Sequence, residues 1–220
     1  MQRLTIDIVS DVTCPWCIIG YQSLKLALQQ LEKELAATLS WHPFEINPQV
    51  GKQGQIKREN LQQKYGLSDE QIAQNFDNIT KRANELGFDM RLDKQSHTYN
   101  TFDAHRLLHW AKLQGQDTAL KMALFTLYFT DGGNPSDHQA LLQQVDQLGL
   151  DVDAAKQILA SDSYAEEVRA DISHYQQLGI TSVPTFVING KYGISGGQPV
   201  ESFVEGLRNL ALKERGNSGK

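Results

Sequence analysis

The segment DVTCPWCIIG, residues 11–20, contains both cysteines of the chain, Cys14 and Cys17. Residues 4–10, just before it, alternate between apolar and polar side chains, which predicts a β-strand. After it, leucines recur at helical spacing up to Leu35, which predicts a helix to about residue 37. Pro15 suits the first helical position because its φ is already helical and its missing N–H costs nothing there. The two thiols are therefore expected on the first turn of a helix that follows a strand.

Two thiols at C-x-x-C spacing are close enough to form a disulfide, and the thiolate is the reacting species. The N–H groups and dipole of a helix N-terminus stabilise an anion, so we expect the pKa of Cys14 to be lowered. Cys14 is then the attacking thiol, and Cys17, one turn further along, resolves the mixed disulfide. Pro15 and Trp16 carry no charge, so backbone donors and the surroundings must tune the pair.

Two other interpretations of the cysteines stay open at this point. They can be half of a zinc site, to which His105 and His109, four residues apart in a predicted helix, could contribute. They can also be inert and buried. The strand-to-helix context and Pro15 fit a redox turn better than either alternative.

The composition of the 220 residues is ordinary for a globular protein, with 40% hydrophobic and 21% charged residues and a net charge of -5. No Lys/Arg-rich block favours nucleic acid or an anionic membrane as a partner. No apolar run approaches the roughly 20 residues of a transmembrane helix. The N-terminus already reads as a strand and not as a signal peptide, so a cytoplasmic location is expected. Because structural disulfides are rare in the cytosol, a C-x-x-C pair there indicates redox chemistry or metal binding.

Strand and helix patterns divide the chain into three parts. Residues 1–50 read as β-α-β, residues 51–164 show only helical periodicity, and residues 165–220 read as α-β-β-α. The two β-rich ends should close into one sheet, which makes the domain of residues 1–50 and 165–220 discontinuous. Residues 51–164 are then an inserted helical domain.

A predicted hairpin late in the chain provides a partner for the redox turn. Its strands, over residues 185–194, flank Asn189-Gly190, the strongest short hairpin signal. Pro184 opens the first of these strands. A proline in that position, facing a C-x-x-C turn, suggests a cis peptide bond between Val183 and Pro184.

Three motifs together resemble the DsbA family of thioredoxin-fold thiol-disulfide oxidoreductases, and among them the FrnE-like branch. They are DVTCPWCIIG at 11–20, NTFDAHRL at 100–107 and ISGGQP at 194–199. The resemblance covers essentially the whole chain. It implies an α/β, thioredoxin-like fold with a large all-helical insertion.

The resemblance also implies how the site works. Pro184 would be the family's cis-proline, and backbone groups of Val183 would pair with an extended substrate segment. The redox-active disulfide of Cys14 and Cys17 would serve in place of a cofactor. The partner would be a protein or small-molecule disulfide, with glutathione as a candidate co-substrate. Periplasmic DsbA enzymes carry histidine where this chain has Trp16, so strong oxidant character does not follow.

The 100–107 motif adds two candidate site residues at the start of a predicted helix. Asp103 and His105 would line the substrate groove or tune Cys14. The simpler interpretation is a capped, solvated first turn with His105 packed at its edge.

Two alternative functions share these features. Kappa-class glutathione transferases and 2-hydroxychromene-2-carboxylate isomerases have the same fold but typically use a serine and no cysteine pair, which counts against them here. A peptide-binding or holdase module with incidental cysteines is the non-catalytic alternative. For an exchange enzyme, whether it reduces, oxidises or isomerises disulfides depends on its potential.

Overall fold

A computed structural model describes residues 2–217 and the side chains of residues 2–213. Strands from both ends of the chain form a four-stranded sheet in the order β2-β1-β5-β6. Their bounds are β1 (Gln2–Ser10), β2 (Leu35–Pro43), β5 (Thr185–Ile188) and β6 (Tyr192–Ser195). β1 is parallel to β2, with Ser10 opposite Pro43, and antiparallel to β5, with Val9 opposite Thr185. The single sheet and the thioredoxin-like fold are as predicted.

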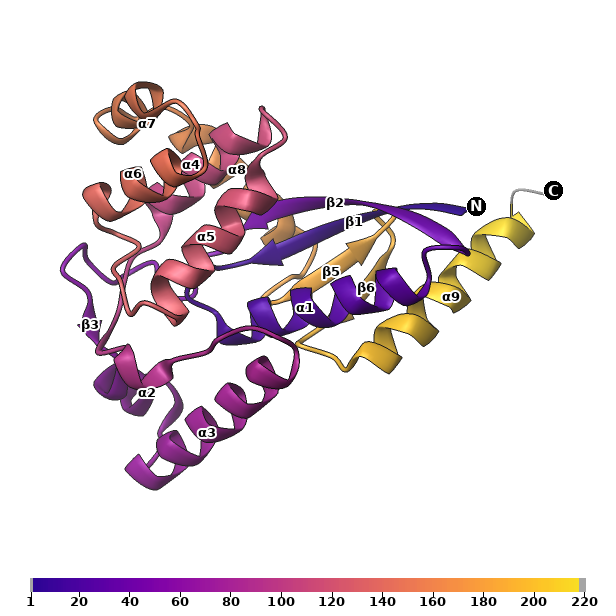
Figure 1. Cartoon of the computed structure of the whole chain (residues 1–220), viewed down its shortest axis with the longest axis horizontal. Helices are drawn as coiled ribbons and strands as arrows, with labels where there is room; N and C mark the ends of the chain where they lie inside the picture. The colour runs from indigo at the N-terminus through magenta and orange to yellow at the C-terminus, as the bar shows by residue number, and fades with distance from the viewer. Residues whose placement is uncertain (1, 218–220) are drawn as a thin grey trace.

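Three helices flank this sheet, as Figure 1 shows. They are α1 (Pro15–Gln30), α8 (Ala165–Gln177) and α9 (Val200–Asn217). α1 and α9 pack on each other and against the sheet, whereas α8 packs on β2. The redox helix α1 therefore starts where β1 ends and runs back along the sheet.

The inserted segment gathers at the end of the sheet toward which β1 runs (Figure 1). It comprises β3 (Gln55–Ile56), α2 (Lys57–Tyr65), α3 (Asp69–Glu85), the 3-10 turn η1 (Leu92–Lys94), β4 (His97–Thr98), α4 (Phe102–Lys112), α5 (Asp117–Phe129), α6 (His138–Gln147) and α7 (Val152–Leu159). The prediction of an all-helical insertion is wrong in one respect, because β3 and β4 pair antiparallel. Two-residue strands are too short to show the alternation that predicts a strand.

The first helix ends earlier than its leucine pattern predicts. α1 stops at Gln30, and β2 begins at Leu35 instead of residue 38. A turn lies between them, in which the N–H groups of Glu34 and Leu35 donate to the carbonyl of Leu31. Leu31 and Leu35 are buried in the same core. Their helical spacing therefore continues across a boundary that periodicity alone does not reveal.

The interior consists of two apolar clusters. The larger one lies between the sheet, α1, α9 and α3, and the smaller one lies among α4, α5, α6 and α7. α5 contributes to both, with Phe125 and Phe129 in the first and Leu120 and Leu124 in the second. The inserted segment thus shares a core with the sheet, and the domain boundaries given above stay a prediction.

One close approach joins α1 to the proline that precedes β5. A Cβ atom at Gly20 would lie 3.0 Å from Cζ of Phe186 and 3.2 Å from Cγ of Pro184. Such distances are too short for a side chain without rearrangement of its neighbours. Gly20 therefore lets the redox helix pack directly on this part of the chain.

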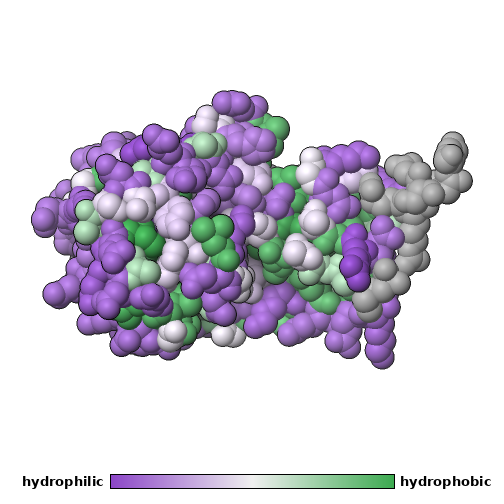
Figure 2. All heavy atoms as spheres, turned by 90° about the horizontal axis from the view of Figure 1, so that it is seen from above, coloured by the Kyte–Doolittle hydropathy of each residue, from purple (hydrophilic) through white to green (hydrophobic). Residues whose placement is uncertain are grey.

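The surface is mostly polar. Figure 2 shows hydrophilic residues over most of one face, with apolar residues in smaller patches between them. Within the described residues, no helix combines the length and the apolar character needed to cross a bilayer.

Candidate active site

Cys14 is the N-cap residue of α1, with extended backbone angles (φ −90°, ψ 111°), and Pro15 follows at the start of the helix. The N–H of Cys14 donates to the carbonyl of Asp11 at 3.2 Å, and the N–H of Cys17 donates to the carbonyl of Cys14 at 3.1 Å. Both thiols are free. The predicted geometry, two thiols on the first turn of a helix that follows a strand, is present.

The late proline forms the opposite side of this turn. The Val183–Pro184 peptide bond is cis, and the thiol of Cys14 lies 3.7 Å from the carbonyl oxygen of Val183, to which it donates. Segments 169 residues apart thus meet at one sulfur atom. Cys14 is 3% exposed and Cys17 is fully buried, whereas Trp16 between them is 39% exposed.

The electrostatics of Cys14 differ from the sequence-based prediction. Burial raises the pKa of the Cys14 thiol well above its ordinary value, and the neighbouring Cys17 thiol and Asp11 carboxyl raise it further. The N–H of Cys17 acts in the opposite direction. The predicted lowering is therefore wrong for this arrangement, because it considered the helix N-terminus and not the protein packed around it.

Asp11, three residues before Cys14, is a buried carboxyl that connects two loops. It accepts from the N–H of Ile46 at 2.7 Å and from the N–H of Thr13 at 3.2 Å. Burial raises its pKa, although these two hydrogen bonds and the charge of Lys121 lower it. Asp11 thus fixes the redox turn relative to the loop that follows β2.

Lys121 brings a positive charge from α5 to the same interior. Its side chain is 1% exposed, and its ammonium group donates to the carbonyl of Ser10 at 3.4 Å. The ammonium also lies 5.3 Å from the ring of Trp41. Burial lowers the pKa of Lys121 to about 8, while the charges of Cys17 and Asp11 act to raise it. By reciprocity, the cation favours thiolate formation at Cys14.

His105, predicted as a groove or tuning residue, is buried beside this group. Its Nε2 donates to the carbonyl of Phe44 at 3.0 Å and lies 3.9 Å from a carboxylate oxygen of Asp11. Burial and the charge of Lys121 hold its pKa well below the ordinary value, so the imidazole is neutral. His109, the other half of the considered zinc pair, packs against the ring of Tyr164.

Asp103, the second candidate of the 100–107 motif, has structural partners. It accepts from Arg106 at 2.8 Å and from His138 at 2.7 Å. Burial raises its pKa, but those two hydrogen bonds outweigh burial, and the net shift is downward. Together with Lys52 and Arg169, it lines a cavity of about 330 Å³. Neither Cys14 nor Cys17 lines this cavity. The structure therefore does not bring Asp103 to the redox turn.

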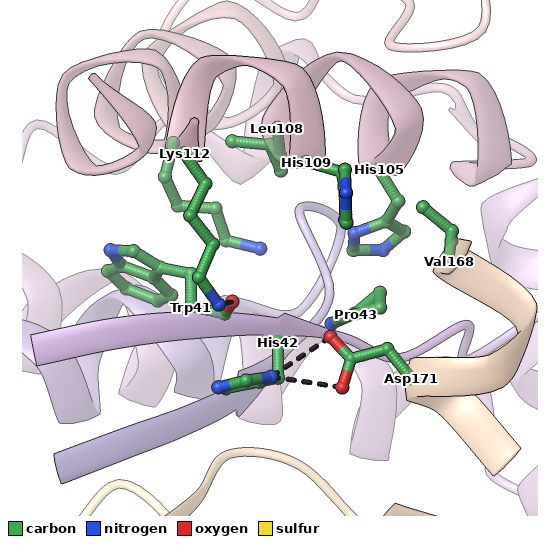
Figure 3. A pocket seen from close by; sticks show the side chains of 10 residues that line it. Trp41, His42, Pro43, His105, Leu108, His109, Lys112, Val168 and Asp171 are labelled. Carbon is green, nitrogen blue, oxygen red and sulfur yellow. Dashed lines mark hydrogen bonds and ion pairs between the residues drawn. The ribbon is translucent and has the colours of Figure 1, made fainter. Parts of the chain in front are cut away.

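A separate small cavity of about 20 Å³ lies behind the buried group, between α4, α8 and β2 (Figure 3). His105, Lys121, His42 and Asp171 are among the residues that line it. This volume is about that of one water molecule. His42 is hydrogen-bonded to Asp171 at 2.9 Å through Nδ1, and its Nε2 lies 3.4 Å from Asp7.

Trp16 has a neighbour from the insertion that the sequence analysis missed. The guanidinium of Arg82, on α3, lies 5.9 Å from the centre of the Trp16 ring. It also donates to the carbonyl of Gly197 at 2.8 Å. Gly197 belongs to the ISGGQP motif, so two of the three motifs meet at Trp16.

Some of the missed residues had a signal in the sequence. Lys121 interrupts an otherwise apolar helix face four residues before Phe125, which indicates a buried cation. Asp11 stands between a buried strand and the first cysteine. Arg82 offered no such signal, because many of its neighbours on α3 are also polar and nothing marks this residue out among them.

No group of three or more His, Cys, Asp or Glu side chains within the described residues is arranged to hold a metal ion. The cysteines, His105 and His109 have the separate partners given above.

Comparisons with known proteins agree with this arrangement. A family model described as a DSBA-like thioredoxin domain matches residues 5–208. The chain is 36% identical to a probable DsbA oxidoreductase from Streptomyces coelicolor, whose structure superposes with a TM-score of 0.88 over 96% of this chain and 91% of that one. It is 28% identical over 186 residues to the uncharacterized protein YwbO of Bacillus subtilis, which is 83% of this chain and 86% of that protein.

More distant structures share the fold. The cytosolic disulfide reductase DsbM of Pseudomonas aeruginosa, solved with GSH, is 18% identical with a TM-score of 0.59 over 94% of this chain and 98% of that one. A 2-hydroxychromene-2-carboxylate isomerase is 15% identical with a TM-score of 0.69 over 96% and 98%. Identities this low show similarity of fold alone.

Proposed function

The chain belongs to the DSBA-like thioredoxin domain family, a family of thiol oxidoreductases, and we propose that its own reaction is disulfide exchange at Cys14 and Cys17. The observation that carries this proposal is the contact of the Cys14 thiol with the carbonyl of Val183, 3.7 Å away, next to the cis peptide bond. This contact brings the thiol of the N-cap residue Cys14 next to backbone groups of Val183, with which an extended substrate segment could pair.

In the reducing direction, the thiolate of Cys14 attacks one sulfur of the substrate disulfide. An S–S bond forms between Cys14 and that sulfur, the substrate S–S bond breaks, and its other sulfur leaves as a thiolate. The thiolate of Cys17 then attacks Sγ of Cys14. This step forms the Cys14–Cys17 disulfide and releases the second substrate thiolate, so the substrate gains two electrons and the dithiol loses two. Oxidation is the same sequence in reverse.

The roles of the two cysteines follow from their positions. Cys14 caps the helix and adjoins the exposed Trp16, whereas Cys17 is fully buried one turn further in. These positions support the proposal that Cys14 meets the external sulfur and that Cys17 attacks Cys14 from inside. The charge of Lys121 supports thiolate formation at Cys14, against the effect of burial on that thiol.

The substrate in this proposal is a protein or small-molecule disulfide, and glutathione is the proposed small-molecule thiol. The similarity in fold to DsbM, whose structure contains GSH, motivates glutathione as the first compound to test. We also propose a cytosolic location. The chain has no cysteines beyond the C-x-x-C pair, so its fold needs no structural disulfide.

The test is turnover of oxidised glutathione and reduction of insulin by the wild type, Cys14→Ser and Cys17→Ser. Cys14→Ser should lose activity by more than about 10³-fold, because the remaining thiol, Cys17, is fully buried and is not in a position to form the mixed disulfide with a substrate. Cys17→Ser should accumulate that mixed disulfide, seen as an added mass on the intact protein. Undiminished turnover by Cys14→Ser would contradict the proposal.

The transferase or isomerase alternative makes a different prediction. A glutathione-dependent transferase would retain conjugating activity when both cysteines are replaced by serine. Two free thiols in the C-x-x-C turn, with that of Cys14 beside the Val183 carbonyl, favour exchange instead.

A further inference from the structure

Arg82 is a cation of the insertion held against the redox turn without an ion-pair partner in the described part of the chain. Its Nη2 donates to the carbonyl of Gly197 at 2.8 Å, and its guanidinium carbon lies 5.9 Å from the centre of the Trp16 ring. Its Nε is buried and has no hydrogen-bond partner. A carbonyl oxygen and an aromatic ring are therefore the contacts that hold this side chain.

Gly197 brings a third segment to the same place. A Cβ atom there would lie 3.0 Å from Cε3 of Trp16, 3.2 Å from the carbonyl oxygen of Trp16 and 3.3 Å from Cγ2 of Ile19. The turn at residues 196–197 therefore touches the redox turn directly. Because Arg82 donates to the carbonyl of Gly197, it fastens this turn to α3.

The Trp16 ring thus has neighbours from two other segments, the Gly197 turn and Arg82, while 39% of the residue stays exposed. It adjoins Cys14, the proposed attacking thiol. An incoming disulfide must come close to Cys14, so the side chains next to that disulfide approach the indole. Aromatic rings at such surfaces bind apolar groups with little loss of conformational entropy.

We propose that Arg82 is a positioning residue that holds the Trp16 indole beside Cys14, where the indole contacts an apolar side chain next to the substrate disulfide. This inference rests on the proposed exchange function. It names the substrate class as disulfides with apolar neighbours, and it assigns a role to the contact between the insertion and the ISGGQP motif.

The test is a double-mutant cycle with two disulfide peptides that differ only in a leucine or a glycine next to the cysteine. Arg82→Gln should raise KM for the leucine peptide roughly two- to five-fold with kcat unchanged, which is the range expected for losing an exposed cation–π contact. It should leave the glycine peptide unaffected. In a Trp16→Ala background, Arg82→Gln should have no further effect, because the two residues act through one contact.

Matched variants separate positioning from folding. Arg82→Lys keeps the positive charge and a hydrogen-bond donor, so its KM for the leucine peptide should lie between those of the wild type and Arg82→Gln. It also provides the test if Arg82→Gln is unstable. Lys81→Gln, an exposed neutralisation on the same helix, should match the wild type. Equal losses for both peptides, or additive effects of Arg82→Gln and Trp16→Ala, would overturn the inference.

A readout without catalysis keeps the two proposals distinguishable. The fluorescence of Trp16 is obtained by subtracting the spectrum of Trp16→Ala from that of the wild type. Arg82→Gln should increase acrylamide quenching of this component, and unchanged quenching would overturn the positioning role. If the wild type catalyses no exchange, the proposed function fails, and the quenching experiment still decides whether Arg82 holds Trp16.

Discussion

The redox turn and the cluster around His42 both bury titratable side chains, yet their environments favour opposite protonation states. At Cys14, burial dominates and the neutral thiol is favoured. At His42, burial lowers the pKa, but the interactions of the ring with the carboxylates of Asp171 and Asp7, which accept from it, outweigh burial, so the charged imidazolium is favoured. The cluster ties β1, β2 and α8 together with paired charges, whereas the thiols have a distant cation and no direct partner charge. A stabilised charge pair suits a structural role, whereas the Cys14 thiol, which has no such pair, must lose its proton before it can react.

Replacing Asp11 should have the largest of the three expected effects, because Asp11 connects the redox turn to the rest of the fold. Asp11→Ala leaves the N–H groups of Ile46 and Thr13 buried without an acceptor, and it should lower the free energy of unfolding by about 2–4 kcal/mol. Urea denaturation measures this loss. Asp11→Asn, which keeps one carbonyl oxygen, should lose less. Asp77→Ala on the exposed side of α3 serves as the control, and equal losses for the two alanine variants would contradict the assigned role.

Lys121 tests whether the buried cation compensates for the unpaired thiols. Lys121→Met should slow alkylation of Cys14 by iodoacetamide at pH 7 roughly three- to ten-fold, because removing the positive charge raises the thiol pKa further. The rate measured against pH should show the same shift. Lys25→Met on the exposed face of α1 is the control, and an unchanged alkylation profile for Lys121→Met would refute the coupling.

His42 gives the smallest effect and the sharpest pH dependence. Its folded pKa is raised, so its contribution to stability is full below the unfolded pKa and is lost as the pH rises through the folded value. The folded pKa of Asp7 is lowered, so its contribution is lost as the pH falls. His42→Gln should therefore cost about 1 kcal/mol near pH 5.5 and clearly less at pH 8.5, as measured by urea unfolding at both values. The exposed His174→Gln is the control, and a cost independent of pH would rule out the charged pair.

Local chemical signals account for what the sequence predicted correctly. Asn189-Gly190 forms the predicted hairpin turn. The capping box of Ser68 and Gln71 at the start of α3 is likewise formed by residues close together in the chain. Cys14 and Pro15 start α1 as expected. In each case, the residues that decide the conformation are neighbours in the chain.

Contacts between distant segments account for what the sequence analysis missed. The end of α1 was placed too late because Leu35 belongs to a strand facing the same core as the helix. The pKa of Cys14 depends on burial by segments from both halves of the chain. The 100–107 motif suggested that Asp103 belongs to the redox site, but its carboxylate is hydrogen-bonded to His138, which lies on another helix. No spacing rule within one segment contains this information.

Gly20 sets how closely the redox helix α1 packs against Pro184. A single methyl group there would press on both Phe186 and Pro184, so the absence of a side chain at residue 20 is what permits this close packing. Enlarging it would push α1 away from the proline and lengthen the path from the Cys14 sulfur to the Val183 carbonyl. For anyone redesigning this protein, position 20 is thus a means of adjusting the width of the substrate-binding surface without altering a single reactive atom.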